Sequence, residues 1–396
     1  MPYYTGISRF GQAPWKGVFY QMIYLDYAAT APVPRAVADA MIEVLTERYG
    51  NPSSQYPFGA EMKKRVEDWR RAVAALLDCP AEGLHFTSCG TEGDNWALRA
   101  AVWQNRHVGN HIVTTAVEHS AVLECCKWLE REGCEVTYLA PDQNGSLTAE
   151  QVLEAVRPDT AAVSVMLVNN ELGTVYPVAD IARGLAARNP KTLLHTDAVQ
   201  GLGTFSARAL GADFVTVSAH KIGGPKGVGA LYIGPRVRNP RPLLAGGGQE
   251  RGLRSGTEAT AQIAGFARAA ELRLEGRERN RAHLEALHAV ALEKLLAIPD
   301  MVCVGAGTAP HILPLSLAGW PAGNIVNDLG SQGICISAGS ACHQGKPSHV
   351  VAALKLPKRV AAGVIRLSFG PGTTEADIDA CAQALRRHRD TRMPML

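Results

Sequence analysis

Short β-branched runs alternate with amphipathic segments along much of this chain. An apolar run rich in β-branched residues is typical of a buried strand, and an apolar stripe at helical spacing is typical of a helix that covers a sheet. This alternation predicts an α/β fold in which helices cover both faces of a mostly parallel, doubly wound sheet. Strands are expected at residues 160–168, 192–195, 214–217 and 229–233, and helices at 121–131 and 178–188.

The length of the chain allows more than one lobe. With 396 residues, of which 46% are hydrophobic and 19% charged, it can bury a large core and is expected to divide into two lobes. Residues 257–297 are expected to be mostly helical, because they contain no Pro and are rich in Ala, Leu, Glu and Arg. A different arrangement of strands and helices follows, so we place the boundary near Glu275.

The composition argues against several classes of protein. The formal net charge is +3 and basic residues are interspersed with acidic ones, which disfavours a DNA- or RNA-binding surface. No apolar run reaches the roughly 18 residues that span a bilayer, and the N-terminus lacks a secretory signal pattern, so we expect a cytoplasmic protein without membrane contact. Nine cysteines without CxxC pairs argue against a disulfide framework or zinc module, and no metal site is predicted.

An aspartate and a lysine follow two of the expected strands. Asp197 lies in HTDAVQ (195–200) and Lys221 in SAHKIGGPKG (218–227). A lysine that bonds to a cofactor aldehyde must lose its charge near neutral pH, and a carboxylate facing a pyridine nitrogen keeps that ring protonated as an electron acceptor. Small and polar residues before the lysine can reach a phosphate. Together these residues predict a pyridoxal 5'-phosphate site.

Gly90 and Thr91 lie between an expected strand end and an expected helix. Backbone N–H groups at a helix N-terminus and a threonine hydroxyl suit an anion, and phosphate is the fitting guest. Standing alone, the segment would favour an ordinary threonine N-cap preceded by glycine. Beside the lysine and aspartate motifs, the phosphate interpretation is preferred.

Motifs of one family follow one another in order from about residue 22 to residue 374. They are YLDYAAT (24–30), NPSS (51–54), FTSCGTE (86–92), VEH (117–119), VNNELG (168–173), GGGQER (246–251), RSGT (254–257), SAGSAC (337–342) and IRLSF (365–369). Each motif alone is weak, but the ordered series makes coincidence improbable. The chain resembles the NifS- and IscS-like cysteine desulfurases of the class V aminotransferase group, within the fold-type I pyridoxal phosphate enzymes.

This resemblance implies a large cofactor-binding domain, with a doubly wound and mostly parallel sheet, and a smaller α+β domain. It places the large domain at residues 37–275 and the small domain at residues 22–36 together with 276–396. Residues 1–21 precede the resemblance and form an N-terminal extension.

The resemblance also implies positions around the cofactor. His119 would stack on the pyridine ring and exchange protons with the substrate, although a lone histidine at a helix start is more often a cap or a surface group. Asn170 would reach polar atoms of cofactor or substrate, and Gln200 would lie near the ring hydroxyl. Ser218 and His220 match the phosphate ligands of the family.

Two further positions concern the substrate and a second subunit. Arg366 matches the arginine that grips the substrate carboxylate, for which a guanidinium fork is suited, and a structural ion pair is the alternative. Thr257 resembles the residue that contacts the phosphate across a subunit boundary, which implies a homodimer. A simple helix cap is the other interpretation of Thr257.

Cys342 distinguishes a desulfurase from a general aminotransferase. It lies among small residues in SAGSACHQGKPSH (337–349), where His343, Lys346 and His349 favour its thiolate. A desulfurase needs such a thiol to accept the substrate sulfur, whereas an aminotransferase does not. A metal site made of Cys342, His343 and His349 has too few ligands to be favoured.

The sequence departs from the family pattern at three places. Gly-Ala is usual where residues 89–90 are Cys-Gly, and Ser-Asn is usual where residues 93–94 are Gly-Asp, although Thr91 is kept. Only residues 343–346 separate Cys342 from Pro-Ser, where the family commonly has a longer stretch. A shorter tether has less reach, which favours persulfide formation over transfer to a distant acceptor.

The implied reaction converts L-cysteine to L-alanine. Lys221 moves the Cα proton, Asp197 stabilises the ring cation, and the Cys342 thiolate takes the sulfur as a persulfide for a sulfur-acceptor protein, for example in iron–sulfur cluster assembly. An aminotransferase or a selenocysteine lyase on the same fold is an alternative. A sulfur-delivery subunit that depends on a partner is an alternative of a different class.

Overall fold

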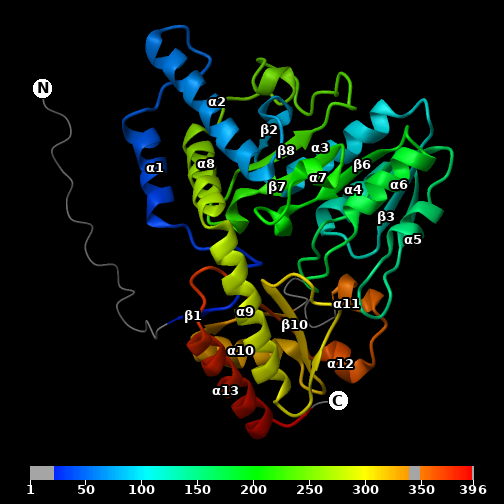
Figure 1. Cartoon of the computed structure of the whole chain (residues 1–396), viewed down its shortest axis with the longest axis vertical. Helices are drawn as coiled ribbons and strands as arrows, with labels where there is room; N and C mark the ends of the chain where they lie inside the picture. The colour runs from blue at the N-terminus through cyan, green and yellow to red at the C-terminus, as the bar shows by residue number, and fades with distance from the viewer. Residues whose placement is uncertain (1–21, 339–347, 395–396) are drawn as a thin grey trace, which may run out of the picture.

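The computed structural model describes residues 22–338 and 348–394 and contains two bodies joined through long helices (Figure 1). The predicted N-terminal extension at 1–21 and the predicted nucleophile Cys342 lie outside the described residues.

A seven-stranded sheet forms the centre of the larger body, in the order β2-β8-β7-β6-β5-β3-β4. Strands β7, β6, β5, β3 and β4 run parallel to one another, and β8 is antiparallel to both β7 and β2. The predicted mostly parallel sheet is therefore confirmed. The strands are β2 Leu84–Thr87, β3 His111–Thr115, β4 Glu135–Leu139, β5 Thr160–Ser164, β6 Leu193–Asp197, β7 Phe214–Ser218 and β8 Gly229–Ile233.

The strand predicted at residues 160–168 is shorter than expected, because β5 ends at Ser164. The chain nevertheless stays beside β6, since the N–H groups of Val165 and Leu167 donate to the carbonyls of His195 and Asp197 at 3.2 and 2.9 Å. Residues 165–168 are apolar because they are buried, although they lie beyond the last regular strand pairing of β5.

Helices cover both faces of this sheet, because side chains along a strand alternate in direction. Val163 and Val215 pack with helices α2 and α6, whereas Ala162 and Phe214 pack with α3 on the other face. The doubly wound architecture is thus confirmed, and the helices predicted at 121–131 and 178–188 are α4 and α6. The helices of this body are α1 Arg35–Thr46, α2 Pro57–Leu77, α3 Gly90–Gln104, α4 Ser120–Arg131, α5 Ala149–Glu154, α6 Val178–Arg188, α7 Ala207–Leu210 and α8 Thr260–Glu275.

The smaller body contains an antiparallel sheet in the order β12-β13-β10-β9 and a parallel pair, β1-β11. Its apolar residues, among them Leu25, Leu287 and Ile365, form a core of their own. The elements are β1 Ile23–Tyr24, β9 Met301–Cys303, β10 Ile312–Leu317, β11 Ile334–Cys335, β12 Ser337–Ala338 and β13 Val364–Ser368, with α9 Arg277–Leu296, α10 Ala322–Ser331, α11 His349–Ala353, α12 Lys358–Ala362 and α13 Glu375–Thr391.

The helical stretch predicted at 257–297 is two helices that break at Gly276. Helix α8 packs on α1 and α2, and α9 continues into the smaller body, where it packs on α13 and β9 (Figure 1). The domain limits 22–36, 37–275 and 276–396 stay a prediction, which this break supports. Helix α11, from the predicted small domain, packs Val350 and Val351 into the core of the larger sheet.

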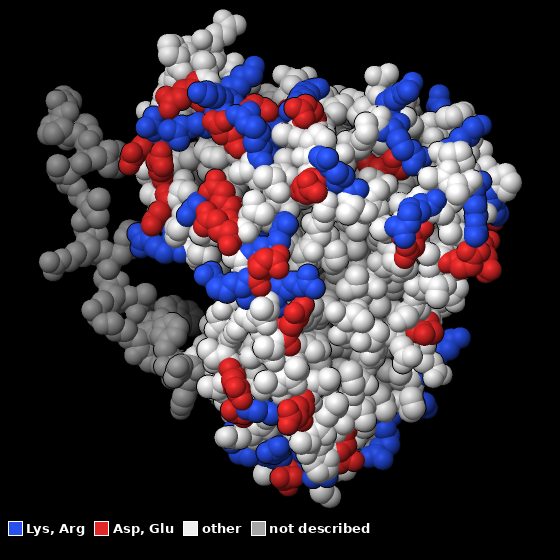
Figure 2. Space-filling model, viewed as in Figure 1, with Lys and Arg blue, Asp and Glu red and all other residues white. Residues whose placement is uncertain are grey.

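The surface carries charges of both signs. On the face shown in Figure 2, basic and acidic side chains of the described residues lie close to one another across both bodies. In the described part of the chain, each helix is too short or too polar to cross a membrane.

Candidate active site

A pocket of about 320 Å³ lies where the carboxyl ends of several strands meet. Strands β2, β3, β6 and β7 run in the same direction, so the segments that follow them gather at one edge of the sheet. Strand β13 of the smaller sheet contributes one further residue. The predicted residues that line this pocket are Gly90, Thr91, His119, Asn170, Asp197, Gln200, Ser218, His220, Lys221 and Arg366.

Asp197 is the last residue of β6 and is 6% exposed. One of its carboxylate oxygens accepts the N–H of Val199 at 2.9 Å. Burial, and then the nearby carboxyl of Asp94, raise the pKa of Asp197 to about 7. A cation placed against this carboxyl would lower its pKa and keep it ionised.

Lys221 follows β7 and reaches across to the N-terminal segment. Its Nζ donates to the carbonyls of Ala28 and Ala29 at 2.7 and 3.0 Å. Burial, and then the charge of Arg366, lower the pKa of Lys221 to about 8, so a fraction of the side chain is a neutral amine near pH 7. The turn that follows needs Gly223, whose φ is +86° and whose added Cβ would lie 3.0 Å from a side-chain atom of Pro34.

The N-terminus of α3 and the end of β7 line one part of the pocket with groups that can bind an anion. Cys89 precedes α3 without a side-chain capping bond, so the first N–H groups of the helix remain available to an anion. Thr91 and Ser218 supply hydroxyls beside them. Nδ1 of His220 lies 3.2 Å from Oγ1 of Thr30, and burial, followed by Lys221, lowers the pKa of His220 to about 4.

His119 both caps a helix and faces the pocket. Its Nδ1 accepts the N–H of Ala121 at 3.2 Å, at the start of α4. Because Nδ1 is an acceptor, the neutral ring carries its proton on Nε2. Ligand atoms of His119, Asp94 and Asp197 lie within 4.8 Å of one another, so the capping bond holds the imidazole beside the buried carboxyls.

Arg366 is buried in β13 and already has two partners. Its two terminal nitrogens donate to the carbonyl oxygen of Asn170 and to Oδ1 of Asp26, each at 2.7 Å. Its Nε is buried without a hydrogen-bond partner among the described residues. The structural ion pair considered for Arg366 is therefore present, and the guanidinium still lines the pocket.

Gln200 lines the pocket and forms a hydrogen bond with the N-terminal segment. Its Nε2 donates to the carbonyl of Ala28 at 2.9 Å, the same carbonyl that accepts from Lys221. This bond leaves the amide oxygen of Gln200 as the polar atom that can meet a ring hydroxyl.

The aminotransferase class-V family profile matches residues 23–381. The chain belongs to this family. Among curated class-V relatives, the cysteine desulfurase IscS of Clostridium botulinum (strain Kyoto / Type A2) is 39% identical over 376 residues, 92% of this chain and 94% of that protein. A cysteine desulfurase of Nostoc sp. is 42% identical over 371 residues, 92% of both chains.

Solved structures of similar proteins agree with the class-V assignment. A NifS-like protein superimposes with a TM-score of 0.88 at 35% identity, covering 94% of this chain and all of that one. The SspA protein in complex with cysteine gives a TM-score of 0.77 at 30% identity over 89% of this chain and 99% of its own. The predicted family and the fold-type I architecture are confirmed.

One described residue that was predicted for the site of this class-V family member, Thr257, does not line the pocket, because it is exposed in the segment before α8. Cys342, His343 and Lys346 lie outside the described residues. His349, the first residue of α11, is described, and its Nε2 lies 2.9 Å from the carbonyl oxygen of Glu118.

Asp94 is not among the predicted site residues, although it lines the pocket and is 1% exposed. It lies on the buried face of α3, with Oδ1 3.4 Å from Nε2 of His195, and burial raises its pKa to about 7. The signal in the sequence was present, because Asp94 is one of the departures from the family pattern.

Proposed function

We propose that the protein is a pyridoxal-phosphate-dependent cysteine desulfurase that converts L-cysteine to L-alanine and transfers the sulfur to Cys342. Relatives named cysteine desulfurase over more than nine-tenths of this chain support the substrate and the reaction. One observation carries the proposal: Lys221, an amine with a lowered pKa, and Asp197, a buried carboxyl, line the same pocket.

The residues present fit this cofactor. The helix N-terminus and the hydroxyls of Thr91 and Ser218 suit its phosphate, and a Cβ at residue 90 would lie 3.0 Å from Cγ2 of Val199, so Gly90 keeps that end of the pocket open. Asp197 would hold the proton on the pyridine nitrogen. When bound, pyridoxal phosphate supplies a protonated ring that withdraws electrons from the substrate Cα.

Lys221 would hold the cofactor and then move the substrate proton. At neutral pH part of its population is a free amine, which is the form that accepts a proton from Cα. The carbonyls of Ala28 and Ala29 restrict where Nζ lies, and they accept its hydrogens when it is charged. His119, with its proton on Nε2, is a second group that can exchange a proton at this site.

Arg366 would bind the substrate carboxylate. Its fork matches two carboxylate oxygens, and its buried Nε has a hydrogen to donate. Without substrate, one terminal nitrogen of Arg366 donates to Asp26. A substrate carboxylate would compete with Asp26 for that nitrogen.

The Cys342 thiolate would then attack the substrate sulfur. A sulfur–sulfur bond forms as the Cβ–sulfur bond breaks, and the electron pair from the broken bond stays with the substrate carbons, which take up a proton and leave as alanine. Cys342 keeps the sulfur as a persulfide, from which an acceptor protein can take it.

Described residues on both sides of the segment 339–347 support the role of Cys342. Oγ of Ser337 donates to Oδ2 of Asp26 at 2.8 Å, beside Arg366. On the other side, His349 contacts the carbonyl of Glu118, next to His119. Both attachment points are therefore at the edge of the pocket.

The direct test is Cys342→Ser. We expect this variant to keep the visible absorbance of the cofactor and to lose sulfide release from cysteine under a reductant. Cys303→Ser is the matched control, because Cys303 is an exposed cysteine on β9 away from the pocket, and it should retain both properties.

Product analysis of the wild-type protein tests the reaction class. Alanine and sulfide should form in equal amounts without a 2-oxo acid. A requirement for a 2-oxo acid would contradict the proposal and indicate an aminotransferase, and turnover only after an acceptor is added would indicate a sulfur-delivery subunit.

We also propose that the protein acts as a homodimer in which Thr257 contacts the phosphate bound by the other subunit. The exposed position of Thr257 is compatible with such a contact. Thr257→Ala should then weaken cofactor binding in equilibrium dialysis without changing the oligomeric state.

A further inference from the structure

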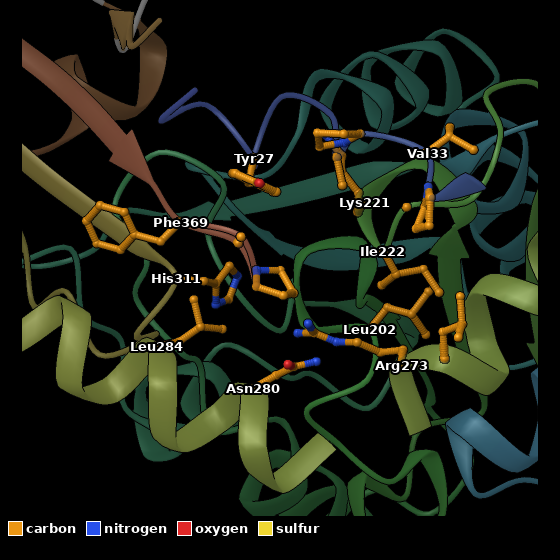
Figure 3. A pocket seen from close by; sticks show the side chains of 18 of the residues that line it. Tyr27, Val33, Leu202, Lys221, Ile222, Arg273, Asn280, Leu284, His311 and Phe369 are labelled. Carbon is orange, nitrogen blue, oxygen red and sulfur yellow. The ribbon is translucent and has the colours of Figure 1, made fainter. Parts of the chain in front are cut away.

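A second cavity, of about 400 Å³, lies beside the cofactor pocket. The two share a wall made of Val199, Gln200 and Lys221. The remaining walls come from residues 27 and 31–34, from the bend between α8 and α9, from residues 369–372, and from Leu202, Ile222, Gly223 and His311 (Figure 3). No step of the proposed reaction uses this second cavity.

Arg273 places a largely buried guanidinium in the second cavity. Burial, and then the charge of Arg277, lower its pKa. The guanidinium of Arg273 makes no hydrogen bond or ion pair with any described residue. A buried charge without a partner is costly, and such charges are normally paired or bound to a ligand.

The direction of Arg273 is fixed by its packing. Gly203 has a φ of +87°, and a Cβ added there would lie 2.7 Å from Cγ and 3.0 Å from Nε of Arg273. The side chain therefore passes tightly over this glycine. Figure 3 shows its guanidinium directed into the cavity, toward the same space as the side chains of Asn280 and His311.

The charge of the second cavity is one-sided. Its lining, all of it from described residues, includes Arg273, Arg279 and Lys221 but no Asp or Glu. Within the described residues, the side-chain amide of Asn280 has no hydrogen-bond partner either. The cavity therefore offers several N–H donors and no carboxylate to meet them.

His311 adds an acceptor to this set. Its Nε2 lies 3.0 Å from the carbonyl of Gln200, and its Nδ1 is buried without a partner among the described residues. Burial, and then Arg273, lower the pKa of His311 to about 4, so the ring is neutral at pH 7. Nε2 then donates to the carbonyl of Gln200, and Nδ1, which belongs to a residue of the cavity wall, keeps an unused lone pair.

We propose that the second cavity binds a small oxyanion that also carries a protonated oxygen, such as hydrogen phosphate or a hydroxycarboxylate. The fork of Arg273 binds two of the anion's oxygens, the amide of Asn280 donates to another, and Nδ1 of His311 accepts the remaining hydroxyl. Arg279 supplies a further positive charge at the edge.

The experiment uses the enzyme with pyridoxal phosphate bound, so that the cofactor pocket is filled and its absorbance reports that it stays filled. Inorganic phosphate should raise the melting temperature in a saturable manner and give a titration in calorimetry, with no loss of cofactor absorbance. Arg273→Met should weaken phosphate binding about tenfold or more, because a charged hydrogen-bond donor is removed.

Arg268→Met is the matched control. Arg268 lies on the same helix but pairs with Glu271, and its replacement should leave phosphate binding unchanged. Without phosphate, Arg273→Met should melt at the same or a higher temperature than the wild type, since it removes an unpaired buried charge. A purely structural arginine would give a lower melting temperature.

Three results would overturn the proposal. The first is that neither phosphate nor malate binds the wild-type enzyme at millimolar concentrations. The second is that Arg273→Met binds phosphate as tightly as the wild type. The third is loss of cofactor absorbance during the titration, which would place the phosphate in the cofactor pocket. Sulfate, which has no protonated oxygen near pH 7, should bind more weakly than phosphate, and equal binding would overturn the role of His311.

Discussion

Replacing Asp94 by Asn should make the cofactor-free protein more stable than the wild type at pH 8. Asp94 is 1% exposed, and burial raises its pKa from 3.8 to about 7. The ionisable groups near it include His195 and Asp197 on β6, His119 at the start of α4, and the buried Glu118 and Cys125. Burial lowers the pKa of His195 to about 4, so the nearest base supplies no positive charge to an ionised Asp94 at neutral pH.

The size of the effect follows from proton linkage. A carboxyl whose pKa is 3.8 when unfolded and about 7 when folded binds its proton more tightly in the folded protein. The resulting stability is complete below pH 3.8 and is lost as the pH rises to about 7. At about 1.4 kcal/mol for each pKa unit, the loss has an upper limit of about 4 kcal/mol. Asn has the same shape and no charge, so the variant avoids this loss.

Urea unfolding of both cofactor-free proteins between about pH 5 and pH 8 measures the effect. The free energy of unfolding of Asp94→Asn minus that of the wild type should grow with pH by on the order of 2–4 kcal/mol and level off near pH 8. Asp68→Asn, at an exposed site on α2, is the control and should show no such growth. A difference that does not change with pH, or a variant less stable than the wild type at pH 8, would refute the reasoning.

Three further predictions concern the buried charges. Arg70 and Glu250 form a buried ion pair with two hydrogen bonds, of 2.6 and 3.0 Å. Arg70→Met should therefore lower the free energy of unfolding by about 3–5 kcal/mol in the same urea assay, and adding Glu250→Gln should recover part of that loss. A loss below about 1 kcal/mol for Arg70→Met would contradict the prediction. The rate at which the cofactor-free protein binds pyridoxal phosphate covalently at Lys221 should rise with pH, with a midpoint near 8. Arg366→Gln should move that midpoint upward, because a neighbouring cation that lowers the pKa of Lys221 is removed. Stopped-flow absorbance measures this rate, and an unchanged midpoint in the variant would contradict the prediction. Arg366→Lys should raise the KM for cysteine about tenfold or more, since an ammonium lacks the planar fork, and steady-state kinetics with an unchanged KM would argue against carboxylate binding at this residue.

Elements with strong local patterns were predictable from the sequence. The helices expected at 121–131 and 178–188 appear as Ser120–Arg131 and Val178–Arg188, because their apolar stripes match one face of the sheet. The meeting of the site residues was also predictable, since residues after parallel strands gather at one edge. The end of β5 was not, because apolar residues 165–168 remain buried after the regular pairing stops.

The finer geometry of the pocket could not be read from local patterns. Arg366 pairs with Asp26 across 340 positions of sequence, and this pairing depends on how the smaller sheet closes on the N-terminal segment. The second cavity depends on the packing of Arg273 over Gly203 and on the bend between α8 and α9. Such contacts arise only when segments that are distant in sequence pack together.

The hold of the N-terminal segment on Lys221 has a consequence for biosynthesis. The carbonyl of Ala28 accepts from Lys221, while the N–H of Ala28 donates to Oγ of Ser368 at 2.9 Å and β1 pairs with β11. Until Ser368 has been translated, the segment that contacts Lys221 lacks this hydrogen-bond partner, so one wall of the cofactor site is not yet held in place. Stable binding of the cofactor is therefore expected only after β13, which carries Ser368, has emerged from the ribosome.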